Sequence, residues 1–375
     1  MKHRIPRRFP LLAALLLLTH LGCDSDIPVK SGAPGIGRMT VLDTGGKNGD
    51  TGWWPSIVLD RNATPHLSYC DAYNGNLMYG TRLPDGTWKT EVVISEGAVG
   101  KYTSIAVAPN GTLGLAFYDQ DLKYLRYASR APKGAWQLEN VAWGLEIGMA
   151  SELRFDSHNT AHLFYYLPSG KIAHGTRDEK GTWKKSVIAQ STGGFSVRID
   201  AHIREDGLWL SFVHWAFKDT AMYISHASDP TAHKYDTTLV SEKHGPGWKS
   251  QLIFDQAYPS ILFSLNRKQS IKWGTRKKDE WTFKTLERHA GNFAARRSAN
   301  GDVVVALESR ETTRLLGGTL KLLKRVGGTW SSHTIDTEGP NASYLSLAVT
   351  PDGKPIVAYY SRVIKGLKIY DETLP

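Results

Sequence analysis

Short apolar segments alternate with polar turns along almost the whole chain. One stretch reads PSIVLDRNATPHLSYCDAYNGNLMYGTRLPDGTWKTEVV, an apolar strand, an alternating strand, an aromatic strand and a last strand that opens on Gly-Thr-Trp. Alternation of this kind over short segments, bounded by Gly, Pro, Asn and Asp, predicts β-strands. We therefore expect an all-β protein.

This four-strand pattern occurs seven times between Trp53 and Tyr370, at intervals of about 43 to 55 residues. Repeats of this length, each with four short strands, are typical of a β-propeller, in which every repeat forms one blade. The sequence thus predicts a seven-bladed β-propeller. In our alignment the first strands end at Leu59, Val107, Phe155, Ile199, Phe254, Arg297 and Val349.

The last copy stops before its own fourth strand. An open sheet edge would expose unpaired backbone groups. Residues 38–43, RMTVLD, lie just before the first copy and resemble fourth strands such as WKTEVV. We therefore expect the N-terminal strand to complete the seventh blade and close the ring, giving one propeller domain over residues 38–375.

Aromatic residues recur at the same place in the fourth strands. A residue type that recurs once per copy is best explained by blade packing, because a binding site in a ring rarely needs every blade to contribute identically. Cys70 fills a strand position that is Tyr in the next two copies, so we interpret it as a core residue. The recurring aromatics are Trp88, Trp136, Trp183, Tyr235, Trp281 and Trp330.

The first residues have the order of an export signal. Residues 1–22 contain a basic stretch and then LLAALLLLTHLG, which is too short to span a bilayer as a stable anchor. Followed by Cys23, this order is similar to a bacterial lipoprotein signal, and the resemblance implies that Cys23 is lipidated and that the protein resides in the cell envelope, periplasmic or at the cell surface. His20 stands where that family usually has Leu, which leaves ordinary signal cleavage as the alternative. Residues 23–37 are polar and contain Pro and Gly, so we expect a tether.

The charge of the chain favours acidic partners. Its formal net charge is +10, and removal of the basic signal leaves about +6. This excess suits an anionic polysaccharide or lipid headgroups but is too diffuse to indicate nucleic acid. The sequence contains no metal, nucleotide or nucleophile motif, so we expect no cofactor and no metal site. We expect a monomer.

Candidate ligand-binding residues fall on one face of the predicted ring. In propellers, the segments that lead into the first strands share a face with the loops between second and third strands, and function usually resides there. Aromatic side chains at the strand openings would suit stacking on sugars, and arginines in the loops would suit a carboxylate or sulfate. Packing under neighbouring loops is the alternative for the aromatics. The candidates are Trp54, Tyr102, Trp248 and Tyr344 at the openings, and Trp215, Arg267, Arg310 and Arg362 in the loops.

Three residues in the same loops are candidates for catalysis. Asp71 and Asp119 could act as paired carboxylates in acid/base chemistry, and His214 could move a proton. However, the two aspartates occupy one repeat position after an aromatic strand. An Asp there readily caps the following turn through its own side chain, which is the structural alternative.

The aromatic copies bearing PHLSYCD and Gly-Thr-Trp resemble the repeat propellers of exported bacterial proteins of the sialidase-like and lectin-like kind, over nearly all of residues 38–375. The sialidase Asp-box S-x-D-x-G-x-x-W is approached by RLPDGTW but not matched. We therefore expect a membrane-anchored module that binds a glycan or an envelope protein on its rim. The alternatives are a glycoside hydrolase or polysaccharide lyase acting on an acidic glycan, and a protein-interaction scaffold.

Overall fold

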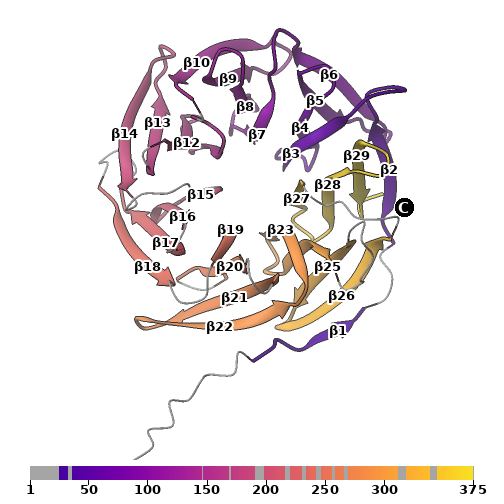
Figure 1. The fold of residues 1–375 in the computed structure, drawn as a ribbon, viewed down its shortest axis with the longest axis vertical. Helices are drawn as coiled ribbons and strands as arrows, with labels where there is room; N and C mark the ends of the chain where they lie inside the picture. Colours follow the sequence, from indigo (N-terminus) through magenta and orange to yellow (C-terminus); the bar gives the residue numbers. More distant parts are fainter. Residues whose placement is uncertain are drawn as a thin grey trace, which may run out of the picture.

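The chain forms a ring of seven four-stranded sheets in a computed structural model (Figure 1). The structure describes residues 25–32, 36–145, 147–168, 170–190, 198–215, 220–229, 234–241, 246–255, 258–265, 269–310, 318–337 and 344–374. Over these residues every element is a strand, and none is a helix that could cross a membrane. The predicted all-β, seven-bladed β-propeller is confirmed.

Each blade is an antiparallel sheet whose strands follow one another in the chain. The first three blades comprise β3 (Thr51–Leu59), β4 (Pro65–Asp71), β5 (Asn76–Arg82) and β6 (Trp88–Ile94); β7 (Lys101–Val107), β8 (Leu113–Asp119), β9 (Tyr124–Arg130) and β10 (Gln137–Trp143); and β11 (Ser151–Phe155), β12 (Ala161–Leu167), β13 (Lys171–Arg177) and β14 (Trp183–Gln190). The next three comprise β15 (Ile199–Arg204), β16 (Gly207–Trp215), β17 (Thr220–Ala227) and β18 (Asp236–Ser241); β19 (Pro246–Ile253), β20 (Ser260–Leu265), β21 (Ser270–Lys277) and β22 (Glu280–Glu287); and β23 (Ala290–Arg297), β24 (Val303–Ser309), β25 (Thr319–Val326) and β26 (Thr329–Asp336).

The seventh blade joins both ends of the domain. Its strands are β27 (Leu345–Val349), β28 (Pro355–Ser361), β29 (Gly366–Asp371) and, at the outer edge, β2 (Arg38–Asp43). β2 pairs antiparallel with β29, with Met39 opposite Tyr370, so the last strand of the chain gains a partner from the first strand of the domain. An ion pair between Arg82 and Asp371 then links this blade to the first.

Part of the expected tether lies on the ring itself. β1 (Val29–Ser31) pairs in parallel with β26, and Ile27 donates from its backbone N–H to the carbonyl of Thr285, at 2.7 Å. Ile27 and Val29 pack on the apolar cluster between the fifth and sixth blades. Residues 25–32 therefore form an arm that is docked on the outer wall of the ring (Figure 1). The polar composition of residues 23–37 gives no indication of this strand pairing or of the packing of Ile27 and Val29.

The recurring aromatics pack between blades, as the repeat argument predicts. Trp136 of the second blade meets Tyr79 of the first, with ring centres 5.5 Å apart. The guanidinium carbon of Arg130 lies 4.5 Å from the centre of the Tyr79 ring and 4.3 Å from that of Trp136. Such cation–π and edge contacts join neighbouring sheets. Cys70 is buried in the core, and burial raises the pKa of its thiol to about 12.

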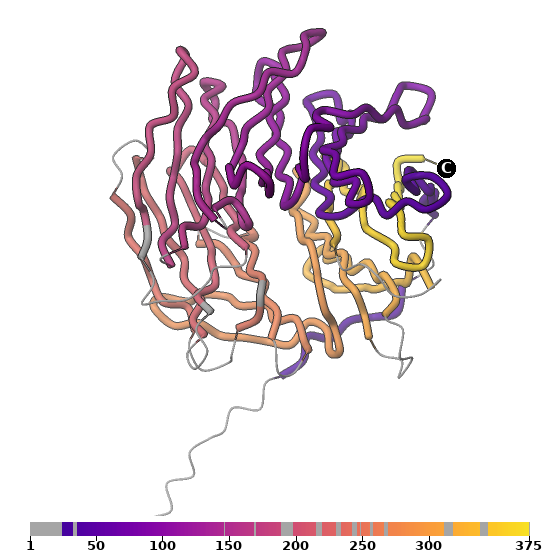
Figure 2. Tube along the Cα trace, turned by 45° about the horizontal axis from the view of Figure 1, so that its top comes forward, coloured from indigo at the N-terminus to yellow at the C-terminus, as the bar shows by residue number. Residues whose placement is uncertain are grey.

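The alignment of the fourth copy was wrong. Ile199 begins β15, whereas Arg204 is the residue that ends it, opposite Gly207. In the first copy the corresponding pair is Leu59 and Pro65. The fourth copy turns within two residues and lacks a Pro-Asn-Gly or Pro-Asp-Gly signal, so its sequence does not mark where the first strand ends. Figure 2 shows the strands of the blades running between the two faces of the ring.

Candidate ligand-binding site at the mouth of the channel

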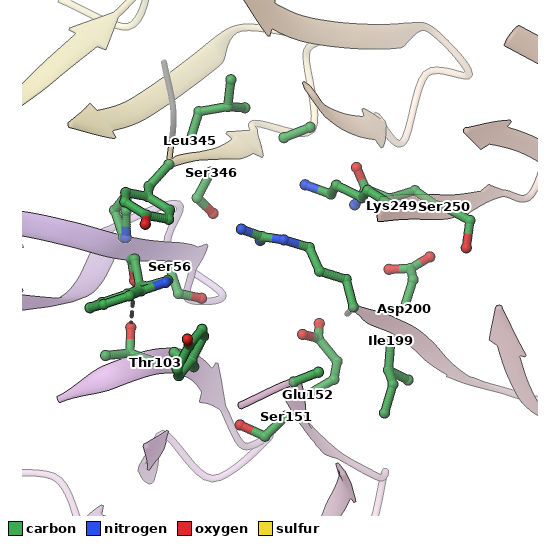
Figure 3. A pocket seen from close by; sticks show the side chains of 18 of the residues that line it. Ser56, Thr103, Ser151, Glu152, Ile199, Asp200, Lys249, Ser250, Leu345 and Ser346 are labelled. Carbon is green, nitrogen blue, oxygen red and sulfur yellow. Dashed lines mark hydrogen bonds between the residues drawn. The ribbon is translucent and has the colours of Figure 1, made fainter. Parts of the chain in front are cut away.

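A pocket of about 320 Å³ lies where the seven first strands begin, around the axis of the ring. We call the face on which it opens the site face. Every blade contributes to the lining, from Trp54 in the first to Tyr344 beside the seventh. The lining is rich in hydroxyl groups, because Ser56, Thr103 and Ser250 all contribute to it (Figure 3).

One wall of the pocket is aromatic. The ring of Trp54 lies 4.7 Å from that of Tyr102 and 5.1 Å from that of Tyr344, centre to centre. All three side chains are half-buried, so part of each surface remains accessible. Trp54 and Tyr102 both have left-handed backbone geometry, with φ of 50° and 56°. This geometry is costly for bulky residues and is commonly retained at functional sites.

The opposite wall is cationic. Arg198 precedes β15, Lys249 lies in β19 and Arg296 lies in β23, and all three line the pocket. The Lys249 ammonium donates to the backbone carbonyl of Phe293, and Arg296 donates to that of Ala295 at 2.9 Å. These backbone contacts orient the two side chains without cancelling their charges.

The two carboxylates of the pocket are engaged by neighbours. Asp200 accepts the backbone N–H of Leu252 at 2.7 Å and lies 2.9 Å from His202 Nε2. Burial raises the pKa of Asp200, but His202 and Arg296 outweigh it, so the pKa is held well below its ordinary range. Glu152 forms an ion pair with Arg154. Figure 3 shows Glu152 and Lys249 directed towards the same space.

The cations crowd one another. Burial, followed by repulsion from Arg198 and Arg296, holds the pKa of Lys249 well below its ordinary value. Burial also lowers the pKa of both arginines. An anion placed among these side chains would relieve that repulsion and favour the protonated lysine. Asp200 and Glu152 offset part of this repulsion, but the three cations outnumber these two carboxylates, so the pocket favours an added anion.

The sequence-derived ligand candidates divide into three groups. Trp54, Tyr102 and Tyr344 line the pocket. Arg310 and Arg362 are exposed in loops of the site face and do not line it. Arg267 lies outside the described residues, as do the side chains of Trp215 and Trp248, and Cys23.

The catalytic candidates lie away from the pocket lining. Asp71 accepts from the backbone N–H and the side-chain amide of Asn74, at 3.2 and 2.7 Å. Asp119 accepts from the Leu122 N–H and pairs with Arg126, both at 2.9 Å. His214 is 3% exposed within β16. The contacts of Asp71 with Asn74 and of Asp119 with Leu122 match the turn-capping alternative, and the paired-carboxylate interpretation stays a prediction.

Sequence reasoning missed the charged side of the pocket. Arg198, Lys249 and Arg296 occupy different positions in their copies, so no repeat signal identifies them. A signal was nevertheless present. In RID (residues 198–200) and ARR (residues 295–297) a charged residue stands in or next to a first strand, whereas the first strands of the other copies consist mainly of apolar or small residues. Within the described part of the chain, no group of three or more His, Cys, Asp or Glu is placed to hold a metal.

No protein-family model matches the chain, and no curated protein matches it. Among solved structures it is similar to YCF48 bound to D1 peptide, with 14% identity over 92% of this chain and 97% of that one, and a TM-score of 0.58. It is also similar to an α-L-arabinanase of Penicillium chrysogenum complexed with arabinobiose, with 14% identity over 75% and 94% of the two chains and a TM-score of 0.53. A third similar structure is the Aleuria aurantia lectin in complex with Fucα1-6GlcNAc, with 13% identity over 78% of this chain and 97% of that one, and a TM-score of 0.50. At such identities the likeness shows the propeller fold and nothing finer.

Proposed function

We propose that the protein is an exported, lipid-anchored binding module that captures an acidic glycan in the pocket of the site face. The observation that carries this proposal is the cationic wall of Arg198, Lys249 and Arg296 facing the aromatic wall of Trp54 and Tyr344 across one pocket. A uronate unit matches both walls, because its carboxylate pairs with guanidinium while the apolar face of its ring stacks on an aromatic side chain.

The size and polarity of the pocket support a sugar-sized ligand. A volume of about 320 Å³ lies at the lower end of the range for small-molecule sites. The hydroxyl groups around the pocket can exchange hydrogen bonds with those of a sugar. Propellers of similar fold include a lectin and an arabinanase solved with sugars, so this architecture is compatible with glycan recognition.

Binding is a better proposal than glycan cleavage. A hydrolase needs a carboxyl group that is protonated at working pH to act as the acid. Asp200, with its lowered pKa, stays ionised, and Glu152 is paired with Arg154. The earlier candidate Asp71 is engaged by Asn74 of its own turn, and Asp119 is engaged by Leu122 of its turn and by Arg126 of β9. We therefore place the hydrolase behind the binding module and keep the lyase and the scaffold as alternatives.

The test is calorimetry of the exported chain with oligogalacturonate and with a neutral oligosaccharide of equal length. The expected result is binding of the acidic ligand only. Arg296→Gln and Lys249→Met should each weaken it by about 1.5–3 kcal/mol, the value of a charge-assisted contact. Affinity should fall with rising salt, and with rising pH as Lys249 loses its proton.

Arg310→Gln is the matched control, because it removes an equal charge from an exposed loop of the same face. It should bind like the parent. If the parent binds no acidic glycan, or if the pocket variants bind it as well as the parent does, the proposal is wrong. Release of reducing ends or unsaturated products from the bound glycan would favour the enzyme.

A further inference from the structure

The loops of the site face are joined to one another by backbone hydrogen bonds from the seventh blade to the end of the second. Following this order, each loop donates an N–H to a carbonyl of the loop before it, at 2.9 to 3.1 Å. The loops therefore form a continuous, mutually braced arc beside the pocket. The bonds run from Thr51 to Lys365, from Tyr73 to Asp50, from Val99 to Gly75, from Gln120 to Ala98 and from Gly144 to Lys123.

Large apolar side chains are exposed along this arc. We call the set formed by Val363, Tyr73, Leu122, Trp143 and Leu145 the apolar crescent. Each of these residues is 54–67% exposed. Isolated exposed apolar residues are ordinary on protein surfaces, but several of them on consecutive, braced loops indicate an interaction surface.

The crescent is joined to the aromatic wall of the pocket through Trp53. Its indole N–H donates to Asp50 at 2.6 Å, and the Tyr360 hydroxyl donates to the same carboxylate oxygen at 2.8 Å. The Trp53 ring also lies 5.4 Å from that of Trp54. The loop of Asp50, whose carbonyl accepts the Tyr73 N–H, is thus tied to the aromatic wall by hydrogen bonds and ring contacts.

The chemistry of the crescent differs from that of the pocket. Its aliphatic members, Val363, Leu122 and Leu145, offer no flat face on which a sugar could stack, but they suit apolar side chains. Among the described residues, the exposed charges in the same loops comprise four cations and two acids, of which Asp121 already accepts the Ala98 N–H at 2.9 Å. They are Lys47, Lys123, Arg362 and Lys365 against Glu96 and Asp121.

We propose that the apolar crescent docks an extended segment of another protein, one that carries apolar side chains and acidic residues. The bonds between loops use five of the backbone N–H groups and five of the carbonyls along the arc, and the exposed apolar side chains supply the contact surface for the partner. An arc of successive loops presents contacts in a row, which an extended chain can meet one after another. The partner segment would reach the crescent without occupying the cationic wall, so the inference goes beyond glycan capture.

The experiment begins with a display library of random linear peptides panned on the immobilised exported chain. Synthetic copies of enriched peptides are then measured by calorimetry. The expected consensus has spaced apolar residues with Asp or Glu among them. The double variant Leu122→Ser, Trp143→Ser should bind about tenfold more weakly or worse, as for residues central to an interface.

The matched control is the double variant Leu83→Ser, Val326→Ser, which removes exposed apolar side chains from turns of the opposite face. It should bind the peptides like the parent. Arg296→Gln should also retain peptide binding while losing oligogalacturonate, so failure of this inference is distinguishable from failure of the proposed function.

Two results would overturn the inference. One is enrichment of no peptide whose binding depends on the crescent. The other is crescent-dependent binding to vesicles of phosphatidylglycerol and phosphatidylcholine without peptide binding, which would assign this surface to a membrane.

Discussion

Asp119 carries a charge that is 1% exposed, and its partners are all within the second blade. Replacement by Ala would leave the Arg126 guanidinium, itself only 14% exposed, without this carboxylate. Breaking a buried ion pair from one side typically costs about 3–5 kcal/mol. We expect Asp119→Ala to lower the free energy of unfolding by about 3 kcal/mol, as measured by urea denaturation.

The same variant separates a structural from a catalytic role. Affinity for oligogalacturonate should be unchanged, because Asp119 does not line the pocket. Asp119→Asn keeps an acceptor for the Leu122 N–H and should lose less stability. Loss of glycan binding with unchanged stability would restore Asp119 to the site.

At the level of single residues, the repeats made the packing role of recurring aromatic residues predictable, but they gave no information on the cations of the pocket. An aromatic residue recurs at the position of Trp136 in the other copies, so the packing of Trp136 between blades could be inferred from the sequence. Lys249 and Arg296 lie at different positions in their copies, and they line one pocket only because the ring brings the first strands together. A single charge in an apolar strand does not reveal which other charges it will face.

At the scale of elements, a buried polar chain connects the third and fourth blades. His162 Nδ1 lies 3.0 Å from His174 Nε2, and the Tyr235 hydroxyl lies 2.9 Å from the other ring nitrogen of His174. Asp156 is 3.4 Å from His162 Nε2. Burial lowers the pKa of His162 below 6.5 despite the opposing effect of Asp156.

Because its pKa is lower in the folded state, His162 favours folding in its neutral form. The unfolded chain takes up the proton near pH 6.5, so stability should be full above that pH and fall as the pH decreases through it. Urea denaturation on both sides of pH 6.5 measures this slope. His162→Gln should flatten it in part, since burial also lowers the pKa of His66 and His333. An unchanged slope in the variant would contradict the assignment.

The two N-terminal strands show what pattern can predict about elements. β2 begins and ends at the expected residues, 38 and 43, because its alternation copies that of the fourth strands and the last repeat lacks one. β1 has only three residues, VKS, with no alternation to detect. It forms because Ile27 and Val29 pack on an apolar cluster that the fifth and sixth blades provide. Such docking depends on a partner surface that the local sequence does not contain.

At the scale of the whole molecule, the docked arm changes how the ring relates to its expected anchor. Residues 25–32 lie along the outer wall of the fifth and sixth blades, and Asp26 pairs with Arg288 at 2.8 Å. If Cys23 carries lipid, the chain reaches the ring within a few residues of the membrane surface. The propeller would then be held close to the membrane at this wall instead of at the end of a long tether.

The last prediction concerns that anchor. The basic, apolar and Leu-Gly-Cys order of the first residues leads us to expect lipid on Cys23. Cys23→Ser should move the exported protein from the membrane fraction to the soluble fraction, because a moderately basic domain has little lasting membrane affinity without acyl chains. Cys70→Ser is the control, since Cys70 is buried in the first blade, and it should remain with the membrane. An unaltered protein that is already soluble, with no fatty acid in its mass, would show that the signal is cleaved without lipidation.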